Sequence, residues 1–437
     1  MADRWQGLPG GVARGEPLVW RNPARQPAAQ ALAAADFRLA DIEDARARWT
    51  RFGPLLAALF PVLRPTAGRI DSPLSELPSE LAARVAGGPG HRVLVKHDDA
   101  LPVTGCIKAR GGVYEVLVLA ERLALDHGLL EDVAAPGQPG APGHERLAGP
   151  AARALFGRFT LVLGSTGNLG FSVGVMGRAL GFEVEVHLSH DAKAWKKDRL
   201  RALGARVIEH ADDYSRAVRA AREASAHRPD CHFVDDESSA QLFLGYATAA
   251  FDLRAQLQAL GVAPSPARPL VVYLPCGVGG APGGVAFGLK QLYGDAVVAV
   301  FVEPVASPCL LVQLASGLAR PVSVYDIGLD NRTAADGLAV GTASMLVARQ
   351  MLPLLDAVAT VRDADLFDWC ARLWRAQGLR LEPSAAAGFA ALAPATSALA
   401  LPPDAIQVVW TTGGGLLPDE PFGAVLAMAG DPGLAGA

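Results

Sequence analysis

The chain has 437 residues, of which 51% are hydrophobic, and its formal net charge is −4. This length provides material for two or three domains with a sizeable buried core. The slightly acidic charge, without a basic block, argues against binding of nucleic acid through a phosphate-neutralising stripe. No apolar run approaches the roughly 18 residues of a membrane span, so we expect no membrane partner. The N-terminal segment has no apolar core typical of a secretory signal, which favours a cytoplasmic location.

The cysteines are few and scattered. There are five, an odd number, and no two of them form a CxxC pair: Cys106, Cys231, Cys276, Cys309 and Cys370. This pattern favours reduced thiols in a cytoplasmic protein over a disulfide framework or a zinc site. For Cys106 and Cys276, which lie in conspicuous motifs, we expect the role of small apolar fillers.

The first part of the chain gives weak structural signals. Residues 1–36 are rich in Pro, Ala and Arg and indicate irregular structure, and residues 38–60 predict a helix that breaks near Gly53 and Pro54. Residues 92–97 predict a short strand. The Gly- and Pro-rich residues 134–143 predict an exposed loop.

From Phe159 onward, apolar strands alternate with helical segments, which predicts parallel sheets covered on both faces. The expected strands are residues 159–163, 182–188, 205–209, 231–234, 270–274, 296–302 and 405–410. The expected helices are residues 171–180, 192–203, 214–225, 240–260 and 285–293. The fold class is therefore α/β, with two lobes that each contain a largely parallel twisted sheet. Ligands of such folds bind at the carboxyl ends of strands, here in a cleft between the lobes.

We expect three structural units. Residues 1–70 form an N-terminal helical extension, residues 71–155 and 239–437 form a large domain, and residues 156–238 form a small α/β domain. The boundary near residues 235–239 separates the two runs of strands.

Lys108 stands in the segment LPVTGCIKARGG, between small residues and an apolar run that predicts a helix over residues 113–120. A lysine in poorly solvated surroundings has its pKa lowered, because desolvation disfavours the ammonium. A neutral lysine amine is a nucleophile that can form a Schiff base. The local pattern is equally compatible with a surface lysine at the start of a helix.

Three turns follow expected strands. Residues 164–170 read GSTGNLG, in which backbone N–H groups at a helix start and the side chains of Ser165, Thr166 and Asn168 could bind a carboxylate or phenolate oxygen. An ordinary capped turn is the alternative. Residues 411–415 read TTGGG, whose hydroxyls could bind a heterocyclic nitrogen, although a flexible loop has the same composition.

The glycine-rich residues 276–284, between a buried strand and a helix, suggest close approach of backbone to a phosphate. No Lys-Ser or Lys-Thr follows, which excludes a Walker loop. Pro282 replaces the third glycine of a dinucleotide fingerprint, and although Glu303 ends the next strand as a ribose-binding acid would, nicotinamide binding is only a minor alternative. The sequence contains no HExxH motif, and the charged residues 195–199 indicate a solvated helix face.

Together these motifs supply what pyridoxal 5′-phosphate (PLP) and an amino acid require: a lysine nucleophile, a phosphate cradle, an oxygen partner, a ring-nitrogen partner and a carboxylate clamp. At this point the sequence resembles the fold-type II PLP-dependent enzymes and, among them, the D-serine dehydratase (D-serine ammonia-lyase) family. The resemblance rests on segments in family order from about residue 17 to residue 418, among them GSTGNLGFSVGVMGRALG, FVDDESSAQLFLGYA, YLPCGVGGAPGG, DNRTAADGLAVG and TTGGGLLP.

The resemblance implies a tryptophan synthase β-like architecture and a role for each matched residue. Lys108 would bind PLP as a Schiff base, Asn168 would contact the ring hydroxyl oxygen and Thr412 the pyridine nitrogen. Ser165 and Thr166 would hold the substrate carboxylate, and Asp236 would contact the substrate side chain. The phosphate would lie in a cradle formed by Gly277, Val278, Gly279, Gly280 and Ala281.

The chain departs from the family pattern at four places. Cys106 stands where serine is usual, Ala281 where glycine is usual and Thr342 where arginine is usual, and residues 388–405 are unusually rich in alanine and proline. These departures concern substrate preference more than the cofactor. A monovalent cation near Glu303 is a further possibility, although one acidic residue does not make a site, and the resemblance favours a monomer.

The implied activity is PLP-dependent β-elimination of D-serine to pyruvate and ammonia, with Lys108 removing the α-proton. Because no residue pattern reveals the stereochemistry, dehydration of L-serine or L-threonine, diaminopropionate elimination, β-replacement and racemisation remain alternatives. A non-catalytic protein that binds a small molecule is the alternative from a different functional class.

Overall fold

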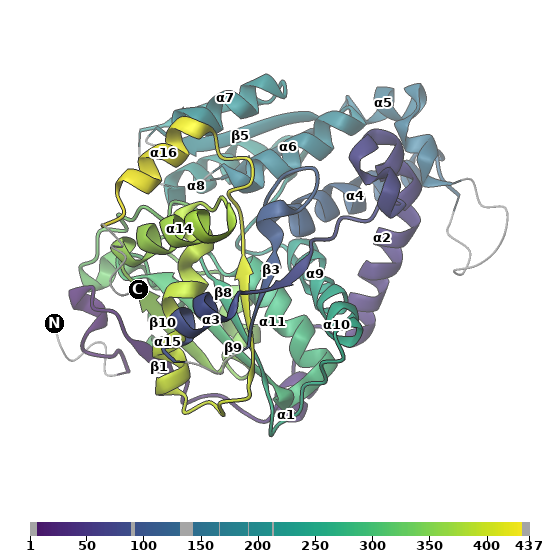
Figure 1. Ribbon diagram of the computed structural model, residues 1–437. Coiled ribbons are helices and arrows are strands. Elements are labelled where there is room, and N and C mark those ends of the chain that lie inside the picture. Colours follow the sequence, from purple (N-terminus) through teal and green to yellow (C-terminus); the bar gives the residue numbers. More distant parts are fainter. Residues whose placement is uncertain are drawn as a thin grey trace.

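The computed structural model describes residues 7–88, 92–131, 143–165, 167–190, 192–211 and 214–430. Two sheets organise these residues, one above the other in Figure 1. The seven-stranded sheet has the order β1 (Val19–Arg21), β10 (Ala357–Val361), β9 (Val297–Pro304), β8 (Leu270–Pro275), β11 (Ile406–Thr411), β3 (Val93–His97) and β2 (Leu74–Glu76). The four-stranded sheet has the order β6 (Arg206–His210), β5 (Glu183–Ser189), β4 (Thr160–Gly164) and β7 (Cys231–Phe233).

The two sheets are parallel except at the edges of the larger one, where β1 and β2 pair antiparallel with β10 and β3. All pairs of the smaller sheet are parallel. We call the four-stranded sheet with its helices the small lobe and the seven-stranded sheet with its helices the large lobe. The expected α/β fold with two largely parallel sheets is confirmed.

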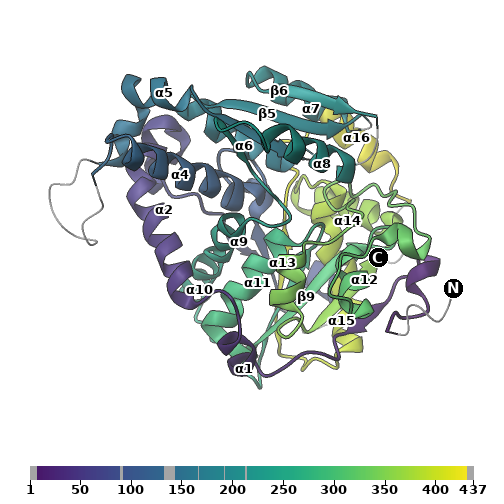
Figure 2. The ribbon, with the colours of Figure 1, turned by 180° about the vertical axis from the view of Figure 1, so that it is seen from behind.

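Sixteen α-helices connect and cover the strands of the described chain (Figures 1 and 2). In the N-terminal part they are α1 (Ala28–Ala33), α2 (Leu39–Leu59), α3 (Ser79–Ala86), α4 (Lys108–Asp126) and α5 (Pro150–Phe156). The small lobe contains α6 (Asn168–Leu180), α7 (Ala194–Ala202) and α8 (Tyr214–Ser225). Then follow α9 (Ala240–Ala247), α10 (Ala249–Ala259), α11 (Gly280–Tyr293), α12 (Cys309–Ser316), α13 (Met345–Met351), α14 (Asp363–Gln377), α15 (Ala387–Ala398) and α16 (Asp419–Ala427).

Short 3₁₀-helices complete the described elements: η2 (Val12–Arg14), η3 (Pro61–Thr66), η4 (Asp98–Ala100), η5 (His144–Ala148), η6 (Gly294–Ala296), η7 (Val324–Ile327) and η8 (Pro383–Ala386). Among the described helices, none combines the length and hydrophobicity needed to cross a membrane.

Burial on both faces explains why the central strands have nearly continuous apolar sequences. Every residue of β8 is buried, and alternate side chains enter opposite cores. Val272 and Leu274 pack with α11 and its neighbours, whereas Val271 and Tyr273 pack on the other face with α15. A strand with both faces covered needs apolar residues at successive positions, and this is the pattern that predicted it.

Helix α4 connects the two lobes, because it packs against α6 of the small lobe and α9 of the large lobe. It starts at Lys108, five residues earlier than the apolar run predicted. The N-terminus of this helix brings Lys108 beside the segments that follow β4, β8 and β11, since Lys108 lines one pocket together with Ser165, Gly277 and Thr412.

Several expectations about secondary structure were wrong. Helix α2 continues through Pro54 without a break, because Phe52, Leu55 and Leu56 bury their side chains completely and this packing offsets the lost hydrogen bond. The helix expected over residues 240–260 is divided at Thr248 into α9 and α10. Residues 1–36 are not wholly irregular, since they contain β1 and α1. Most of the loop expected at residues 134–143 lies outside the described residues.

Candidate active site

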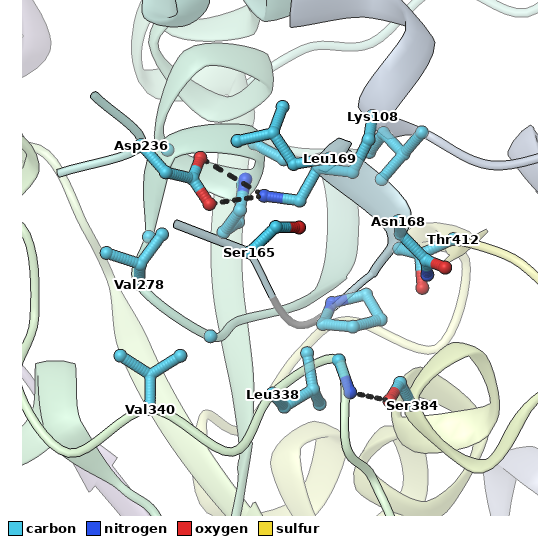
Figure 3. Close-up of a pocket in the computed structure, with 18 of the residues that line it drawn as sticks. Lys108, Ser165, Asn168, Leu169, Asp236, Val278, Leu338, Val340, Ser384 and Thr412 are labelled. Carbon is cyan, nitrogen blue, oxygen red and sulfur yellow. Dashed lines mark hydrogen bonds and ion pairs between the residues drawn. The ribbon is translucent and has the colours of Figure 1, made fainter. Parts of the chain in front are cut away.

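One pocket collects most of the residues that the sequence singled out (Figure 3). It encloses about 620 Å³ of empty space, part of it open to solvent, and residues of both lobes line it. Ser165, Asn168 and Leu169 come from the small lobe. Lys108, Asp236, Thr412 and residues 277–282 approach from the other sides. The expected cleft between the lobes is thus present in the structure.

Lys108 occupies the first turn of α4 and points into this pocket (Figure 3). Its side chain is largely buried, with 18% exposure, and its Nζ lies 3.0 Å from Oδ2 and 3.2 Å from Oδ1 of Asp236. Nζ also lies 5.8 Å from the centre of the Tyr246 ring. The lysine is therefore shielded from water, as the sequence suggested, but it has a carboxylate partner that local reasoning did not identify.

The glycine-rich turn after β8 forms one wall of the pocket. Gly279 has a φ of +108°, which an L side chain rarely adopts, and α11 starts at the next residue. The first N–H groups of a helix have no partner within it, so the amides of Gly280 and Ala281 are available to an anion. Pro282 has no N–H, but at the third helical position none is required. Because Ala281 lies within α11, its departure from glycine leaves its amide available as a donor.

The turn after β4 forms the opposite wall. The Oγ of buried Ser165 accepts hydrogen bonds from the N–H groups of Gly167 (3.0 Å) and Gly170 (2.9 Å). Among the described residues no group accepts the O–H of Ser165, so this hydrogen is available to a ligand in the pocket. Gly167 has a φ of +130°, and α6 starts at Asn168. Thr166 lies outside the described residues.

The third turn is joined directly to the lysine segment. The Ile107 N–H donates to the carbonyl oxygen of Thr412 (2.9 Å), and Cys106 pairs with Gly413 in an isolated β-bridge. Thr412 lies beside Lys108 for two reasons: β11 pairs with β3, and the segment that follows β11 pairs with the segment just before Lys108. Its side chain lines the pocket, as does that of Ser384, whose Oγ accepts the Gly337 N–H (3.1 Å).

Glu382 was not identified from the sequence. It is buried before η8, and its Oε1 accepts a hydrogen bond from Nδ2 of Asn168 (2.8 Å). Its N–H donates to the carbonyl oxygen of Gly413 (3.2 Å). The only signal in the sequence was its position in the family-like segment RLEPSAAAG, since a single glutamate far from the other motifs has no distinctive pattern.

The charged stretch at residues 195–199 is not the solvated face that we expected. Lys196 and Lys197 are buried, with 3% and 7% exposure. The Nζ of Lys196 lies 2.9 Å from Oδ2 of Asp336, and that of Lys197 lies 2.7 Å from Oε2 of Glu209. The inward orientation of α7 could not be read from its composition, because charged residues surround its few apolar positions.

The other sequence predictions have simple structural outcomes. Cys106 and Cys276 are buried free thiols, and burial raises the pKa of both, as expected for inert fillers. Glu303 is fully buried and accepts the N–H groups of Leu310 and Leu311. No group of three or more His, Cys, Asp or Glu side chains within the described ranges is arranged to hold a metal ion. Thr342 pairs with Ser323 in an isolated bridge and does not line the pocket.

The chemistry of the pocket fits PLP. Backbone amides at the start of α11 suit its phosphate, an amine suits its aldehyde, and an amide and a hydroxyl suit its ring oxygen and nitrogen. Gly277 lies close to the backbone of Gly337, since a Cβ added to Gly277 would lie 3.0 Å from the Gly337 carbonyl oxygen, so a side chain at this position would displace the turn.

The comparison with known proteins agrees. The family model for pyridoxal-phosphate dependent enzymes matches residues 71–413, and the chain belongs to this family. Within it, the chain is 51% identical over 416 residues to a probable D-serine dehydratase of Chromobacterium violaceum, covering 92% of this chain and 91% of the relative. It is 49% identical over 430 residues to a probable D-serine dehydratase of Pseudomonas aeruginosa, covering 94% and 93%.

A solved structure supports the fold independently. Diaminopropionate ammonia lyase from Escherichia coli, crystallised in complex with D-serine, superposes with a TM-score of 0.71 at 20% identity. The alignment covers 94% of this chain and 97% of the lyase. The fold-type II architecture that the sequence indicated is therefore confirmed.

Proposed function

We propose that this protein catalyses the PLP-dependent β-elimination of D-serine to pyruvate and ammonia. The observation that carries the proposal is the position of Lys108, whose amine lies between the two glycine-rich turns and opposite a carboxylate. The relatives named probable D-serine dehydratase, about half identical over nearly the whole chain, support the choice of substrate.

The residues of the large-lobe turn would hold the cofactor. The amides of Gly277, Val278, Gly279, Gly280 and Ala281 would bind the phosphate, and Lys108 would bind the cofactor covalently through Nζ. Asn168 would donate its side-chain amide to the ring oxygen, while Glu382 fixes the orientation of this amide by accepting its other hydrogen. The hydroxyl of Thr412 would meet the pyridine nitrogen. PLP, when bound, supplies the electron sink for carbanion chemistry.

The small-lobe turn would hold the substrate. The O–H of Ser165, with Thr166 and the free amides at the start of α6, would bind the carboxylate of D-serine. Binding of the carboxylate would fix the α-carbon relative to Lys108, and such orientation of reacting groups contributes strongly to rate enhancement.

Lys108 would act as the base that removes the α-proton, and Asp236 would hold the resulting ammonium. Asp236 would also contact the substrate hydroxyl, which would take up the proton that Lys108 removed from the α-carbon and leave as water. The enamine product takes up one water and yields pyruvate and ammonia, so that the net reaction consumes no water. A hydroxyl at Thr412, in place of a carboxylate, would leave the bound ring less able to hold negative charge, which would favour expulsion of the substrate hydroxyl over reprotonation of the α-carbon.

We also infer that the protein works as a monomer in the cytoplasm. Five free cysteines, four of them buried, are compatible with a reducing compartment.

The test is a keto-acid assay of the PLP-loaded protein with D-serine and L-serine in parallel. We expect pyruvate from D-serine at a kcat/KM at least roughly a hundredfold above that for L-serine, because only one enantiomer places its α-proton toward Lys108. Formation of pyruvate from L-serine alone, or no keto acid from a fully loaded protein, would contradict the proposal.

A further inference from the structure

Two adjacent lysines of α7 are both buried and both form ion pairs, but in different directions. Lys197 pairs with Glu209 at the end of β6, so its contact stays within the small lobe. Lys196 pairs with Asp336 of the large lobe, at 2.9 Å. Asp336 belongs to the segment before α13, where its neighbours Ala335 and Leu338 pack against the large sheet. Lys196 therefore joins the lobes, and Lys197 does not.

Lys196 also supports the small-lobe turn. A Cβ on Gly167 would lie only 2.6 Å from Cδ of Lys196, so the lysine stem passes directly beneath the turn. Gly167 immediately precedes Asn168 and follows the residues expected to hold the substrate carboxylate. Loss of the Lys196 side chain would remove the surface on which this turn rests.

From Lys196 a chain of polar contacts reaches the cofactor pocket. Its Nζ lies 3.9 Å from Oε2 of Glu382, whose Oε1 accepts the amide of Asn168. On the other side, Asp336 precedes Gly337, whose N–H donates to the Ser384 hydroxyl. Asn168, Gly337 and Ser384 all line the pocket. One buried ammonium thus lies between Asp336, which precedes Gly337, and Glu382, which accepts the Asn168 amide.

Lys196 and Asp336 each stabilise the charged form of the other. Burial alone would lower the pKa of Lys196, but the carboxylates of Asp336 and Glu382 outweigh burial and the pKa is raised. Burial would raise the pKa of Asp336, but Lys196 and Lys193, whose Nζ lies 3.5 Å from Oδ2 of Asp336, outweigh burial and the pKa is lowered. Removing one partner from such a pair leaves an uncompensated buried charge, which disrupts the surrounding contacts.

We propose that Lys196 is a positioning residue for the reaction: it fixes the small lobe to the large lobe through Asp336 and holds the Asn168 turn in register through Glu382. This inference rests on the proposed function, since it assigns Lys196 to the same site. Lys196 does not touch the reacting atoms. Its effect arises because the substrate turn and the cofactor cradle belong to different lobes and must be held at a fixed separation.

The experiment compares Lys196→Met with Lys197→Met in the PLP-loaded protein. Both variants replace a buried lysine of the same helix by an uncharged side chain of similar length. We expect Lys196→Met to lower kcat/KM for D-serine about 10²-fold, mainly through kcat, and to change the absorption spectrum of the resting cofactor because Asn168 is released. Lys197→Met should lower Tm but leave the resting spectrum unchanged and kcat/KM within about twofold of wild type.

Two further variants separate positioning from folding. Lys196→Arg preserves the charge and should restore most of the kcat lost in Lys196→Met. In the double variant Lys196→Met with Asp336→Asn, the loss of kcat/KM should be no greater than in the worse single variant, because both substitutions remove the same ion pair.

Equal kinetic losses in Lys196→Met and Lys197→Met, or an unchanged resting spectrum and kcat in a folded Lys196→Met variant, would overturn the proposal. Failure of the proposed function has a different signature, since the wild type itself would then form no pyruvate from D-serine. The difference in resting spectra between the two lysine variants needs no substrate and tests the positioning role in either case.

Discussion

The two glycine-rich turns of the pocket have the same local plan but different supports. Each follows a parallel strand, contains a glycine with positive φ and starts a helix: Gly167 before α6 and Gly279 before α11. The large-lobe turn packs against the side chain of Val347, the backbone of Gly337 and the thiol of Cys309, whose Sγ lies 3.3 Å from the Gly277 carbonyl oxygen. The small-lobe turn is held by hydrogen bonds to the Ser165 hydroxyl, and it packs on the aliphatic part of the buried Lys196 side chain.

This difference suggests that the large-lobe turn binds the cofactor and the small-lobe turn binds the substrate. A resident cofactor needs a permanently formed cradle, and close packing of apolar groups provides one. A substrate enters and leaves at every turnover, and a turn held by a few polar contacts can respond to it. We therefore expect changes in the large-lobe turn to weaken cofactor binding and changes in the small-lobe turn to weaken use of the substrate.

Lys108, which faces both turns, should give the largest effect. We expect Lys108→Ala to lower kcat for D-serine about 10⁴-fold or more, because the nucleophile and the base are lost together. Lys108→Arg keeps a cation beside Asp236 and serves as the matched variant. It should be equally inactive, and substantial pyruvate formation by either purified variant would show that another residue performs the chemistry.

Gly279→Ala tests the large-lobe turn. A Cβ at this residue would lie 3.1 Å from Cγ1 of Val347 in a backbone conformation of φ +108°. We expect roughly a hundredfold weaker PLP binding by equilibrium titration, because the turn must shift and misplace its amides. Gly317→Ala is the control, since Gly317 also has positive φ (+64°) but has open space around it. Equal cofactor affinities of the two variants would argue against the cradle.

Ser165→Ala tests the small-lobe turn. The variant removes the acceptor of two backbone N–H groups and the free O–H, each worth about 1 kcal/mol, so kcat/KM for D-serine should fall roughly tenfold to a hundredfold. PLP affinity should change little. Ser225→Ala, at the end of α8, removes a buried hydroxyl of the same lobe and should affect neither quantity. Loss of PLP in Ser165→Ala, with normal kinetics once PLP is restored, would contradict the assignment of the small-lobe turn to the substrate.

Glu303, which accepts the N–H groups of Leu310 and Leu311 in α12, gives the most specific effect, a change in stability with pH. Burial raises the pKa of Glu303 from 4.5 to about 8 in the folded protein. Between pH 4.5 and pH 8 the Glu303 carboxyl is ionised in the unfolded chain but protonated in the folded chain. Its contribution to the free energy of unfolding therefore falls as pH rises, by about 1.4 kcal/mol per pH unit.

The corresponding variant is Glu303→Gln, which cannot titrate. The free energy of unfolding of Glu303→Gln minus that of wild type should increase from pH 5 to pH 8, as measured by denaturant titration at several pH values. A difference independent of pH would mean that Glu303 is ionised in the folded protein throughout this range.

The sequence predicted the strands that are buried on both faces, because their apolar runs stand out between glycine-rich turns. It missed β1 and β2, which are three-residue strands at the edges of the sheet and are only partly buried. It also missed β10, a buried strand whose five residues (AVATV) are flanked by no recognisable turn motif. These segments form strands because they pair with strands that are distant in the sequence, and such pairing leaves no signal in the local pattern of apolar residues.

The candidate site shows the same limit. Lys108, Asn168, Thr412 and the large-lobe turn lie in local motifs at strand ends, where the topology of parallel sheets brings them together. The Asp236 partner of Lys108 and the cluster of Lys196, Asp336 and Glu382 depend on contacts between segments far apart in the chain. A charged residue in a charged stretch has the same appearance in sequence whether it faces water or a partner across a lobe boundary.

The most direct measurement is reduction of the PLP-loaded protein with borohydride, followed by digestion and mass spectrometry of the peptides. The account predicts that the reduced cofactor is attached to the peptide that contains Lys108, and that Lys108→Arg abolishes this labelling while Lys196→Met retains it. Attachment to Lys196 or another lysine, or a wild-type protein that binds PLP without any covalent label, would contradict the central claim that the cleft between the two turns is the catalytic site.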